Sequence, residues 1–308
     1  MLALLFPGQG SQTPGMLAPW LNDETKKTLA TWSLHIDLDL ERLGTTASAD
    51  EIKDTANAQP LIVAAGLLGA QALGLSKFSV VAGHSVGEIT AAGVSGVLSP
   101  AHALELVRQR GIAMAKAASQ VETGMAAVLG GDRNEVLSAI KSFDLVPAND
   151  NGAGQIVAAG SLEQIDKLVE NAPAGSRVRP LAVAGAFHTH FMQSAVSHVA
   201  GFVEKVTINE PTSQLLSNKD GAVVAGGKDA IDRIVNQIAN PVRWDLCMQT
   251  MVAGKVTGLI ELFPGGTLTG IAKRAMPGVE LLAIKSVDDL ALVPDFVAKH
   301  QGVESVSS

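Results

Sequence analysis

The stretch Phe78–Glu88, FSVVAGHSVGE, constrains the fold more than any other part of the chain. Its apolar start is typical of a strand buried on both faces, and residues 88–92 begin a helical pattern. Between them, Gly83–Gly87 is a G-x-S-x-G sequence in the strand–turn–helix context of a nucleophile elbow, although an incidental serine in a glycine-bordered turn is the alternative. The turn is so tight that the residues two before and two after the serine must lack a side chain. The stretch therefore predicts an α/β sheet with Ser85 above its edge, at a helix N-terminus that favours negative charge.

Length and composition fit a globular enzyme with a large core. The chain has 308 residues, of which 47 % are hydrophobic and 17 % are charged. A chain of this length forms one big domain, or a big domain with an insertion. The longest apolar window, Leu61–Leu75, is interrupted by Gln71 and is expected to be too short to cross a bilayer, and no basic-then-apolar leader opens the chain. We therefore expect a soluble, cytoplasmic protein with no membrane partner.

Charge and cysteine content narrow the possible partners. The one cysteine, Cys247, excludes an internal disulfide and fits a reducing compartment, and we expect it to be a small buried apolar residue rather than a nucleophile. A net charge of −7 argues against nucleic acid, because a phosphate backbone needs a clustered basic surface. None of the seven histidines lies in H-E-x-x-H or in a Cys/His zinc spacing. We expect no metal site and no cofactor.

A glycine loop follows the first predicted strand. Residues 2–6 form a short apolar run that ends at Pro7, and Gly8–Gln12 is polar and rich in glycine. The loop begins like a dinucleotide fingerprint but fails, because the third glycine position is Thr13. Its free amides would suit an oxyanion hole if it folds beside Ser85, and a plain turn is the equally open alternative.

The remaining chain alternates helical and strand-like stretches. Over 123–184 the predicted order is strand, helix, strand, strand, helix, strand, which indicates an inserted ferredoxin-like (βαββαβ) subdomain. Residues 1–122 and 185–308 would form the main α/β domain around a parallel central sheet. Outside the insertion, helices are expected over 23–34, 49–55, 59–75, 101–118, 229–240, 243–253 and 268–275, strands over 214–217, 258–261 and 280–284, and a frayed tail from Gly302.

Four side chains outside the elbow are candidates for chemistry. His188 and His190 lie where the chain returns from the insertion to the main domain, near an expected cleft, and spacing alone does not choose a general base between them. Arg108 and Arg110 point to different faces of the helix predicted over 101–118. One arginine could face inward, or both could be solvated.

Six motifs along the chain together carry a resemblance to a known family. They are, in order, Phe6-Pro7-Gly8-Gln9-Gly10-Ser11-Gln12, Gly83-His84-Ser85-Val86-Gly87-Glu88, Arg108-Gln109-Arg110-Gly111, Ala186-Phe187-His188, Asn240-Pro241-Val242-Arg243-Trp244 and Pro264-Gly265-Gly266-Thr267-Leu268. This combination resembles the malonyl-CoA:acyl carrier protein transacylases over nearly the whole chain, and GAGQIVAAG and NPVRWDLCM are most similar to the actinobacterial members. The resemblance implies a hydrolase-like α/β core with a ferredoxin-like insertion.

The resemblance assigns catalytic roles that spacing leaves open. Ser85 matches the nucleophile that accepts malonate from malonyl-CoA and passes it to the phosphopantetheine thiol of acyl carrier protein, for fatty acid synthesis. His188 matches the general base of this ping-pong reaction, and Gln237 matches a residue whose carbonyl orients the base in place of an acid. Gln9 and Val86 match the residues whose amides form the oxyanion hole, and elbow geometry also requires Val86 there.

The resemblance also indicates how the acyl group is chosen. Arg110 matches the arginine that pairs with the malonyl carboxylate, which a planar guanidinium does bidentately. Phe187 and His84 belong to the same pocket, and the bulk of Phe187 would crowd an α-methyl branch. Asp150 departs from relatives, which often have an uncharged residue there, and we expect its carboxylate to face solvent.

Pathway and docking stay open. The same chemistry could serve polyketide synthesis or a malonate decarboxylase, and a thioesterase or a malonyl-CoA sensor without turnover are weaker alternatives. We expect a monomer. Since acyl carrier proteins are acidic and this chain is itself negative, docking needs a local basic patch, or else the basic residues are scattered solubilising charges. The candidates for that patch are Arg177, Arg179, Lys273 and Arg274.

Overall fold

The computed structural model describes residues 1–74 and 78–300 of the chain. Its first sheet has five parallel strands in the order β10-β9-β1-β2-β7. The central strand β1 pairs with β2 so that Phe6 lies beside Gly83. The chain therefore leaves both strands at one edge, which brings the Gly8 loop and Ser85 together. The strands are β1 (Leu2–Phe6), β2 (Val80–Gly83), β7 (Gln214–Leu215), β9 (Gly258–Glu261) and β10 (Glu280–Ala283).

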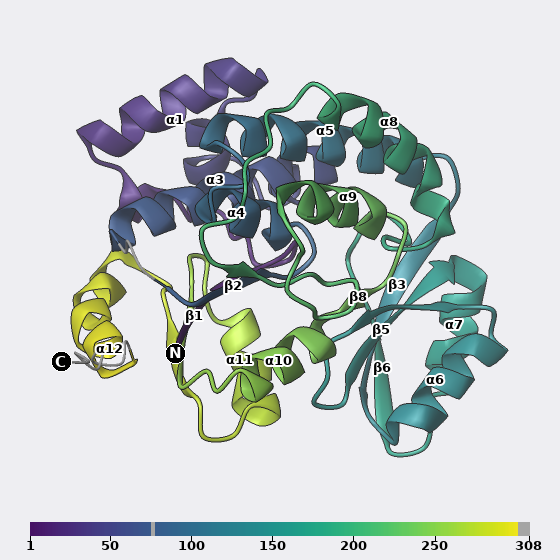
Figure 1. Cartoon of the computed structure of the whole chain (residues 1–308). Helices are drawn as coiled ribbons and strands as arrows, with labels where there is room; N and C mark the ends of the chain where they lie inside the picture. The colour runs from purple at the N-terminus through teal and green to yellow at the C-terminus, as the bar shows by residue number, and fades with distance from the viewer. Residues whose placement is uncertain (75–77, 301–308) are drawn as a thin grey trace.

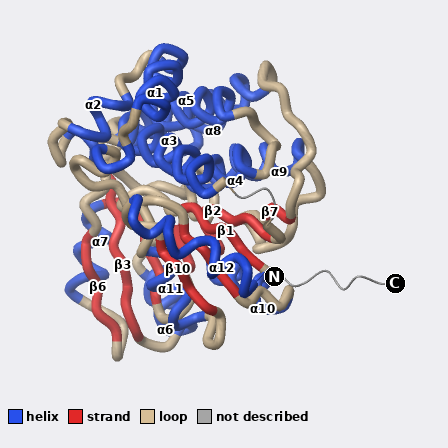
Figure 2. The backbone as a smooth tube through the Cα atoms, turned by 90° about the vertical axis from the view of Figure 1, so that its left-hand side faces the viewer, coloured by secondary structure: helices blue, strands red, loops and turns tan. Residues whose placement is uncertain are grey.

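Helices cover both faces of this sheet (Figures 1 and 2). The alternation of β1 explains this, because Leu2, Leu4 and Phe6 join one apolar cluster while Ala3 and Leu5 join another on the opposite face. The predicted parallel α/β sheet is confirmed. The first face carries α1 (Asp23–Ile36), α2 (Leu40–Thr45), α3 (Thr55–Leu73), α4 (Gly87–Val94), α5 (Pro100–Ala118), α8 (Gln193–Val203) and α9 (Gly227–Gln237), the second α10 (Trp244–Ala253) and α11 (Thr267–Ala275), and α12 (Val293–His300) packs near β9.

A second sheet occupies one end of the molecule (Figure 1). Its order is β6-β3-β5-β4-β8, antiparallel except for the pairing of β4 with β8. Two helices and the sheet enclose a separate small core around Val136, Ile140 and Leu168. The elements are β3 (Thr123–Gly130), α6 (Arg133–Ser142), β4 (Val146–Asp150), β5 (Gln155–Ser161), α7 (Leu162–Glu170), β6 (Ser176–Pro180) and β8 (Val242–Arg243).

The start of α3 corrects two expectations. The helix expected over 49–55 is only a 3₁₀ turn, Glu51–Lys53, and α3 begins at Thr55, where the Asp54 side chain caps it by accepting from Ala56 N–H. Pro60 therefore lies inside the helix and cannot donate to the carbonyl of Ala56. The Arg108 guanidinium donates to that carbonyl instead, at 2.9 Å. This replacement bond explains why the proline is tolerated.

The helix α3 also corrects the argument about membrane spans. It is long and apolar enough to cross a bilayer by length and composition, so the expectation that this stretch is too short does not hold. However, 67 % of its apolar window is buried inside the protein, where the helix packs against α4 and α5. That burial is typical of a core helix.

Other differences concern element ends and short helices. The helices α2, α8 and α12 are not among those predicted from the sequence; α2 and α12 are short, with six and eight residues. The helix expected to reach Leu75 ends at Leu73, where Gly74 takes the left-handed conformation that closes a helix. Leu75 and the tail from Gly302 lie outside the described residues.

Candidate active site

The turn between β2 and α4 holds Ser85 in a strained conformation. Its φ is +52°, in the left-handed region that serine rarely adopts. A Cβ added to Gly83 would lie 1.9 Å from the carbonyl carbon of Gly87, and one added to Gly87 would lie 2.2 Å from the carbonyl oxygen of Phe6. The predicted need for glycine on both sides of the serine is confirmed.

The side chain of Ser85 contacts His188. Its Oγ lies 2.8 Å from Nε2, and Nδ1 of the same ring lies 2.7 Å from the backbone carbonyl oxygen of Gln237. A carbonyl only accepts, so Nδ1 carries the proton and Nε2 is free to accept one from the serine hydroxyl. The predicted nucleophile, base and orienting residue are thus brought together, whereas His190 is exposed on the next turn.

Burial keeps His188 neutral. Its side chain is buried, and burial together with the nearby positive charge of Arg110 lowers its pKa to about 3. The Gln237 carbonyl partly offsets this shift by accepting the Nδ1 proton. At pH 7 the imidazole is therefore unprotonated at Nε2.

The predicted oxyanion-hole residues lie at the same edge of the sheet. Gln9 follows β1, and Val86 directly follows the serine as the N-cap of α4. Within the described part of the chain, neither backbone N–H has a hydrogen-bond acceptor. Both amides are therefore available to a ligand oxygen beside Ser85, where the α4 dipole adds positive potential.

A cavity of about 290 Å³ opens over these groups. Ser85, His188, His84 and Phe187 line it, and so do the glycine loop and the first turn of α11. The His84 ring donates from Nε2 to Asn151 Oδ1 at 2.8 Å, and partial burial lowers the pKa of His84. The apolar lining is Met114, Met125, Val157, Leu181, Val183, Phe187, Leu268 and Ile271.

Arg110 lies behind this cavity rather than in its wall. It is 1 % exposed, whereas Arg108 is half-buried on another face of α5. Its Nη1 donates to Gln59 Oε1 at 2.7 Å and its Nη2 to Gln237 Oε1 at 2.9 Å, while the buried Nε has no partner among the described residues. Burial lowers the Arg110 pKa to about 10, so it remains a cation at neutral pH.

Asp150 does not face solvent as expected. It is buried and accepts from Arg133 Nε at 2.9 Å and Nη2 at 2.6 Å. The alternation along β4 points Asn149 and Asn151 into the cavity and Asp150 to the other side of the strand. Its charge is therefore balanced by Arg133, away from the serine.

Sequence reasoning missed Asn218 and Glu88. Asn218 is fully buried after β7, where its Oδ1 accepts from Ser85 N–H and its Nδ2 donates to the Gly83 carbonyl, both at 2.8 Å. Glu88, in the first turn of α4, accepts from the Asn218 N–H and from Gln237 Nε2. The available signal was position, because Asn218 follows a predicted parallel strand at its carboxyl end, where sites gather.

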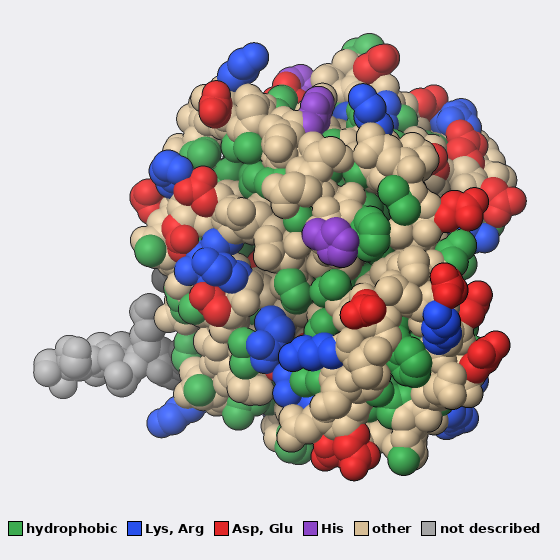
Figure 3. All heavy atoms as spheres, turned by 90° about the vertical axis from the view of Figure 1, so that its right-hand side faces the viewer, with side chains coloured by type: hydrophobic (Ala, Val, Ile, Leu, Met, Phe, Trp, Pro, Cys, Tyr) green, Lys and Arg blue, Asp and Glu red, His purple; other side chains and the backbone are tan. Residues whose placement is uncertain are grey.

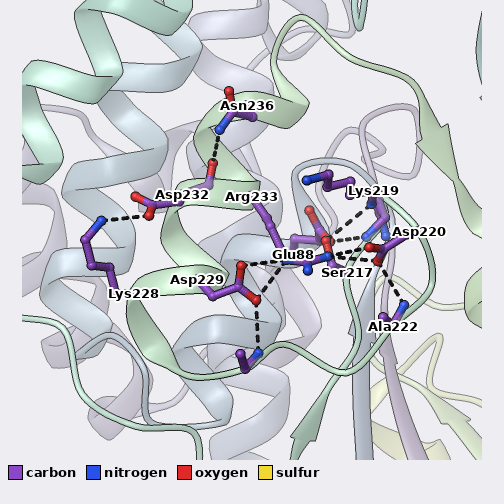
Figure 4. A network of polar contacts seen from close by, with 12 residues as sticks. Glu88, Ser217, Lys219, Asp220, Ala222, Lys228, Asp229, Asp232, Arg233 and Asn236 are labelled. Atoms are coloured by element: carbon purple, nitrogen blue, oxygen red, sulfur yellow. Dashed lines mark hydrogen bonds and ion pairs between the residues drawn. The ribbon is translucent and has the colours of Figure 1, made fainter.

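A second hollow, of about 520 Å³, is larger, but Ser85 and His188 do not line it. Lys219, Arg233, Gln237 and Arg243 line it. Figure 4 shows Arg233 between two carboxylates: it pairs with Asp220 and Asp229, both at 2.8 Å. With most of its positive charge neutralised and no nucleophile in its wall, this hollow is a weaker candidate than the cavity over Ser85.

Known proteins resemble this chain along nearly its whole length. The acyl transferase domain family matches residues 3–306. The malonyl CoA-acyl carrier protein transacylase of Mycobacterium tuberculosis is 53 % identical over 296 residues, 94 % of this chain and 98 % of that protein. A crystal structure of MCAT from Mycobacterium tuberculosis has a TM-score of 0.92 and covers 95 % of this chain and 99 % of that one. A malonyl-transacylase in complex with a type II PKS acyl-carrier protein is 30 % identical, with a TM-score of 0.90 and coverage of 96 % and 99 %.

Proposed function

This chain belongs to the acyl transferase family, among its malonyl-CoA:acyl carrier protein transacylases, and we propose that it transfers malonate from malonyl-CoA to the phosphopantetheine thiol of acyl carrier protein. One observation supports this most: the Ser85 hydroxyl, the His188 ring and the Gln237 carbonyl form a hydrogen-bonded chain beside two free amides. The product would supply fatty acid synthesis.

The geometry supports a ping-pong reaction. Ser85 Oγ attacks the thioester carbonyl carbon while its proton moves to His188 Nε2. The carbonyl oxygen becomes an oxyanion held by the amides of Gln9 and Val86. The carbon–sulfur bond then breaks, and the departing CoA sulfur takes the proton from His188. The thiol of the carrier protein repeats these steps in reverse and leaves with the malonyl group.

Arg110 is the proposed partner of the malonyl carboxylate. Its fork donates to the side-chain oxygens of Gln59 and Gln237. Since a carboxylate is a stronger acceptor than an amide oxygen, the substrate would displace the Gln59 oxygen, which lies in the cavity wall. Phe187 and His84 would shape the same acyl end. An acetyl group offers no carboxylate to hold Arg110 in this way.

Finer features of the fold and the cell biology are also proposals. We assign residues 123–184 to a ferredoxin-like subdomain, and 1–122 with 185–308 to a hydrolase-like core, with the cavity between them. The buried single thiol of Cys247 suits a cytoplasmic protein. We propose that it acts as a monomer, with no nucleic acid, membrane or cofactor involved.

Carrier-protein docking would use local positive charge. Acidic and basic side chains are mixed over the face in Figure 3, and several Lys and Arg side chains lie next to one another near its middle. The local charge can therefore differ from the net charge of −7. The four proposed docking residues Arg177, Arg179, Lys273 and Arg274 are all exposed.

A second pathway is supported by the relative seen with a type II PKS acyl-carrier protein. The chemistry would be unchanged, and only the carrier would differ. The test incubates the enzyme with malonyl-CoA and purified holo carrier proteins of both pathways, and follows the intact mass of each carrier. A malonyl adduct on a carrier supports the transfer. Release of free CoA and malonate without any carrier adduct would instead indicate a thioesterase.

A further inference from the structure

Glu88 is a buried carboxyl group that the reaction above does not use. It is 2 % exposed, and none of the described Lys, Arg or His side chains forms an ion pair with it. Burying a carboxyl group without an ion-pair partner is unfavourable, so we expect Glu88 to have a role that depends on its hydrogen bonds. Its two oxygens have separate partners, the Asn218 N–H and the Gln237 side-chain nitrogen.

The Gln237 amide has an unambiguous polarity in this arrangement. Its Nε2 faces three acceptors: Glu88, the Ser85 carbonyl at 3.1 Å and Asn218 Oδ1 at 3.1 Å. Its Oε1 consequently faces the opposite way and accepts from Arg110 Nη2. A flipped amide would set its oxygen against a carboxyl group and its nitrogen against a guanidinium, so both contacts would be lost.

We propose that Glu88 is a positioning residue that acts through Gln237: it fixes the amide oxygen toward Arg110 and so aims the guanidinium at the malonyl carboxylate. This inference rests on the proposed function. Glu88 touches no substrate atom. Its effect would fall mainly on the choice of acyl group, because Arg110 meets only the carboxylate, whereas the His188 ring is held by the Gln237 backbone carbonyl and not by the Gln237 side chain.

The test measures acyl-enzyme formation from malonyl-CoA and from acetyl-CoA by intact mass in Glu88→Gln. Glutamine keeps the shape but can present an NH₂ group to Gln237 Nε2, so one of the three acceptors that hold the polarity of Gln237 can be lost. Malonyl loading should fall about tenfold or more relative to acetyl loading, the scale of one hydrogen bond to a charged group. Glu135→Gln, an exposed change of the same chemistry on α6, should leave the ratio unaltered.

Two further variants separate positioning from mere stability. Glu88→Asp keeps a carboxyl group and should retain more of the malonyl preference than Glu88→Gln. In an Arg110→Ala background, Glu88→Gln should not change the ratio further, because the group that it aims is gone. If Glu88→Gln does not fold, the comparison of Glu88→Asp with wild type still decides: an unchanged rate of acetyl loading with a lower rate of malonyl loading supports positioning.

Equal loss of malonyl and acetyl loading in the Glu88 variants would overturn the proposal. It would show that Glu88 only stabilises the structure around the elbow. An unaltered ratio in folded Glu88→Gln would overturn it as well. Both results are distinct from failure of the proposed function, in which the wild-type enzyme itself would form no malonyl adduct.

Discussion

Replacement of Arg110 by alanine tests the origin of malonyl specificity. In the structure its guanidinium is 1 % exposed and donates to two side-chain oxygens. If the malonyl carboxylate binds this fork, Arg110→Ala leaves the carboxylate buried and unpaired, at a cost of about 2–5 kcal/mol in transition-state free energy. That range corresponds to about a 30- to 5,000-fold lower rate of malonyl transfer. Acetyl transfer, which has no carboxylate to lose, should be unchanged or faster.

The assay compares rates of acyl-enzyme formation from the two CoA esters, with a thermal melt as the check on folding. The melt is needed because Arg110→Ala also leaves the side-chain oxygens of Gln59 and Gln237 without their donor, which costs about 1–3 kcal/mol of stability for each unsatisfied group. Arg110→Lys should restore charge but not the bidentate fork, and should recover only part of the malonyl rate. An equal fall for both substrates in a folded protein would show that Arg110 is structural, and would refute the specificity argument.

Three further predictions concern stability and docking. Burial raises the pKa of Glu88 to about 8 from 4.5, so the folded state binds more protons than the unfolded state and loses stability as pH rises across that range. The lowered pKa of His188 has the opposite effect, because it makes the unfolding free energy rise with pH between about pH 3 and 6.5. Between pH 6.5 and 8 only the Glu88 effect of these two remains, and it lowers the unfolding free energy by at most about 1.4 kcal/mol per pH unit. Chemical denaturation at several pH values should show that this decrease is smaller in Glu88→Gln. Gly87→Ala should lose about 3 kcal/mol or more in unfolding free energy, since its Cβ would meet the backbone of β1 at 2.2 Å, and a wild-type melt would contradict the elbow geometry. Lys273→Glu with Arg274→Glu should raise KM for carrier protein and leave malonyl loading nearly unchanged, whereas a parallel fall of both half-reactions would place docking elsewhere.

The local features of this site could be predicted from sequence because they depend on neighbours in the chain. The elbow needs glycine two residues on each side of Ser85, and that pattern is visible in eleven consecutive letters. The parallel strand before it and the helix after it follow from hydrophobic runs. The preference for His188 over His190 came from a motif, and spacing alone did not distinguish them.

Contacts between distant segments could not be predicted in the same way. The hydrogen bond from the Ser85 N–H to Asn218 joins residues 133 positions apart, and no periodic pattern in the sequence predicts it. The start of α3 was misjudged because Pro60 is normally found near a helix start, and only a distant side chain, Arg108, makes its internal position acceptable. The expectation that Asp150 faces solvent rests on the cost of a carboxylate near an anionic substrate, and its pairing with Arg133 is not visible in the sequence.

The central claim is that Ser85 carries the malonyl group between the two thiols. Its most direct test is the intact mass of the enzyme after incubation with malonyl-CoA, with peptide mapping of the modified residue and with Ser85→Ala as the control. The account predicts a single malonyl adduct on Ser85 that disappears when holo carrier protein is added and is absent in Ser85→Ala. An unmodified wild-type enzyme, or an adduct that persists in Ser85→Ala, would contradict it.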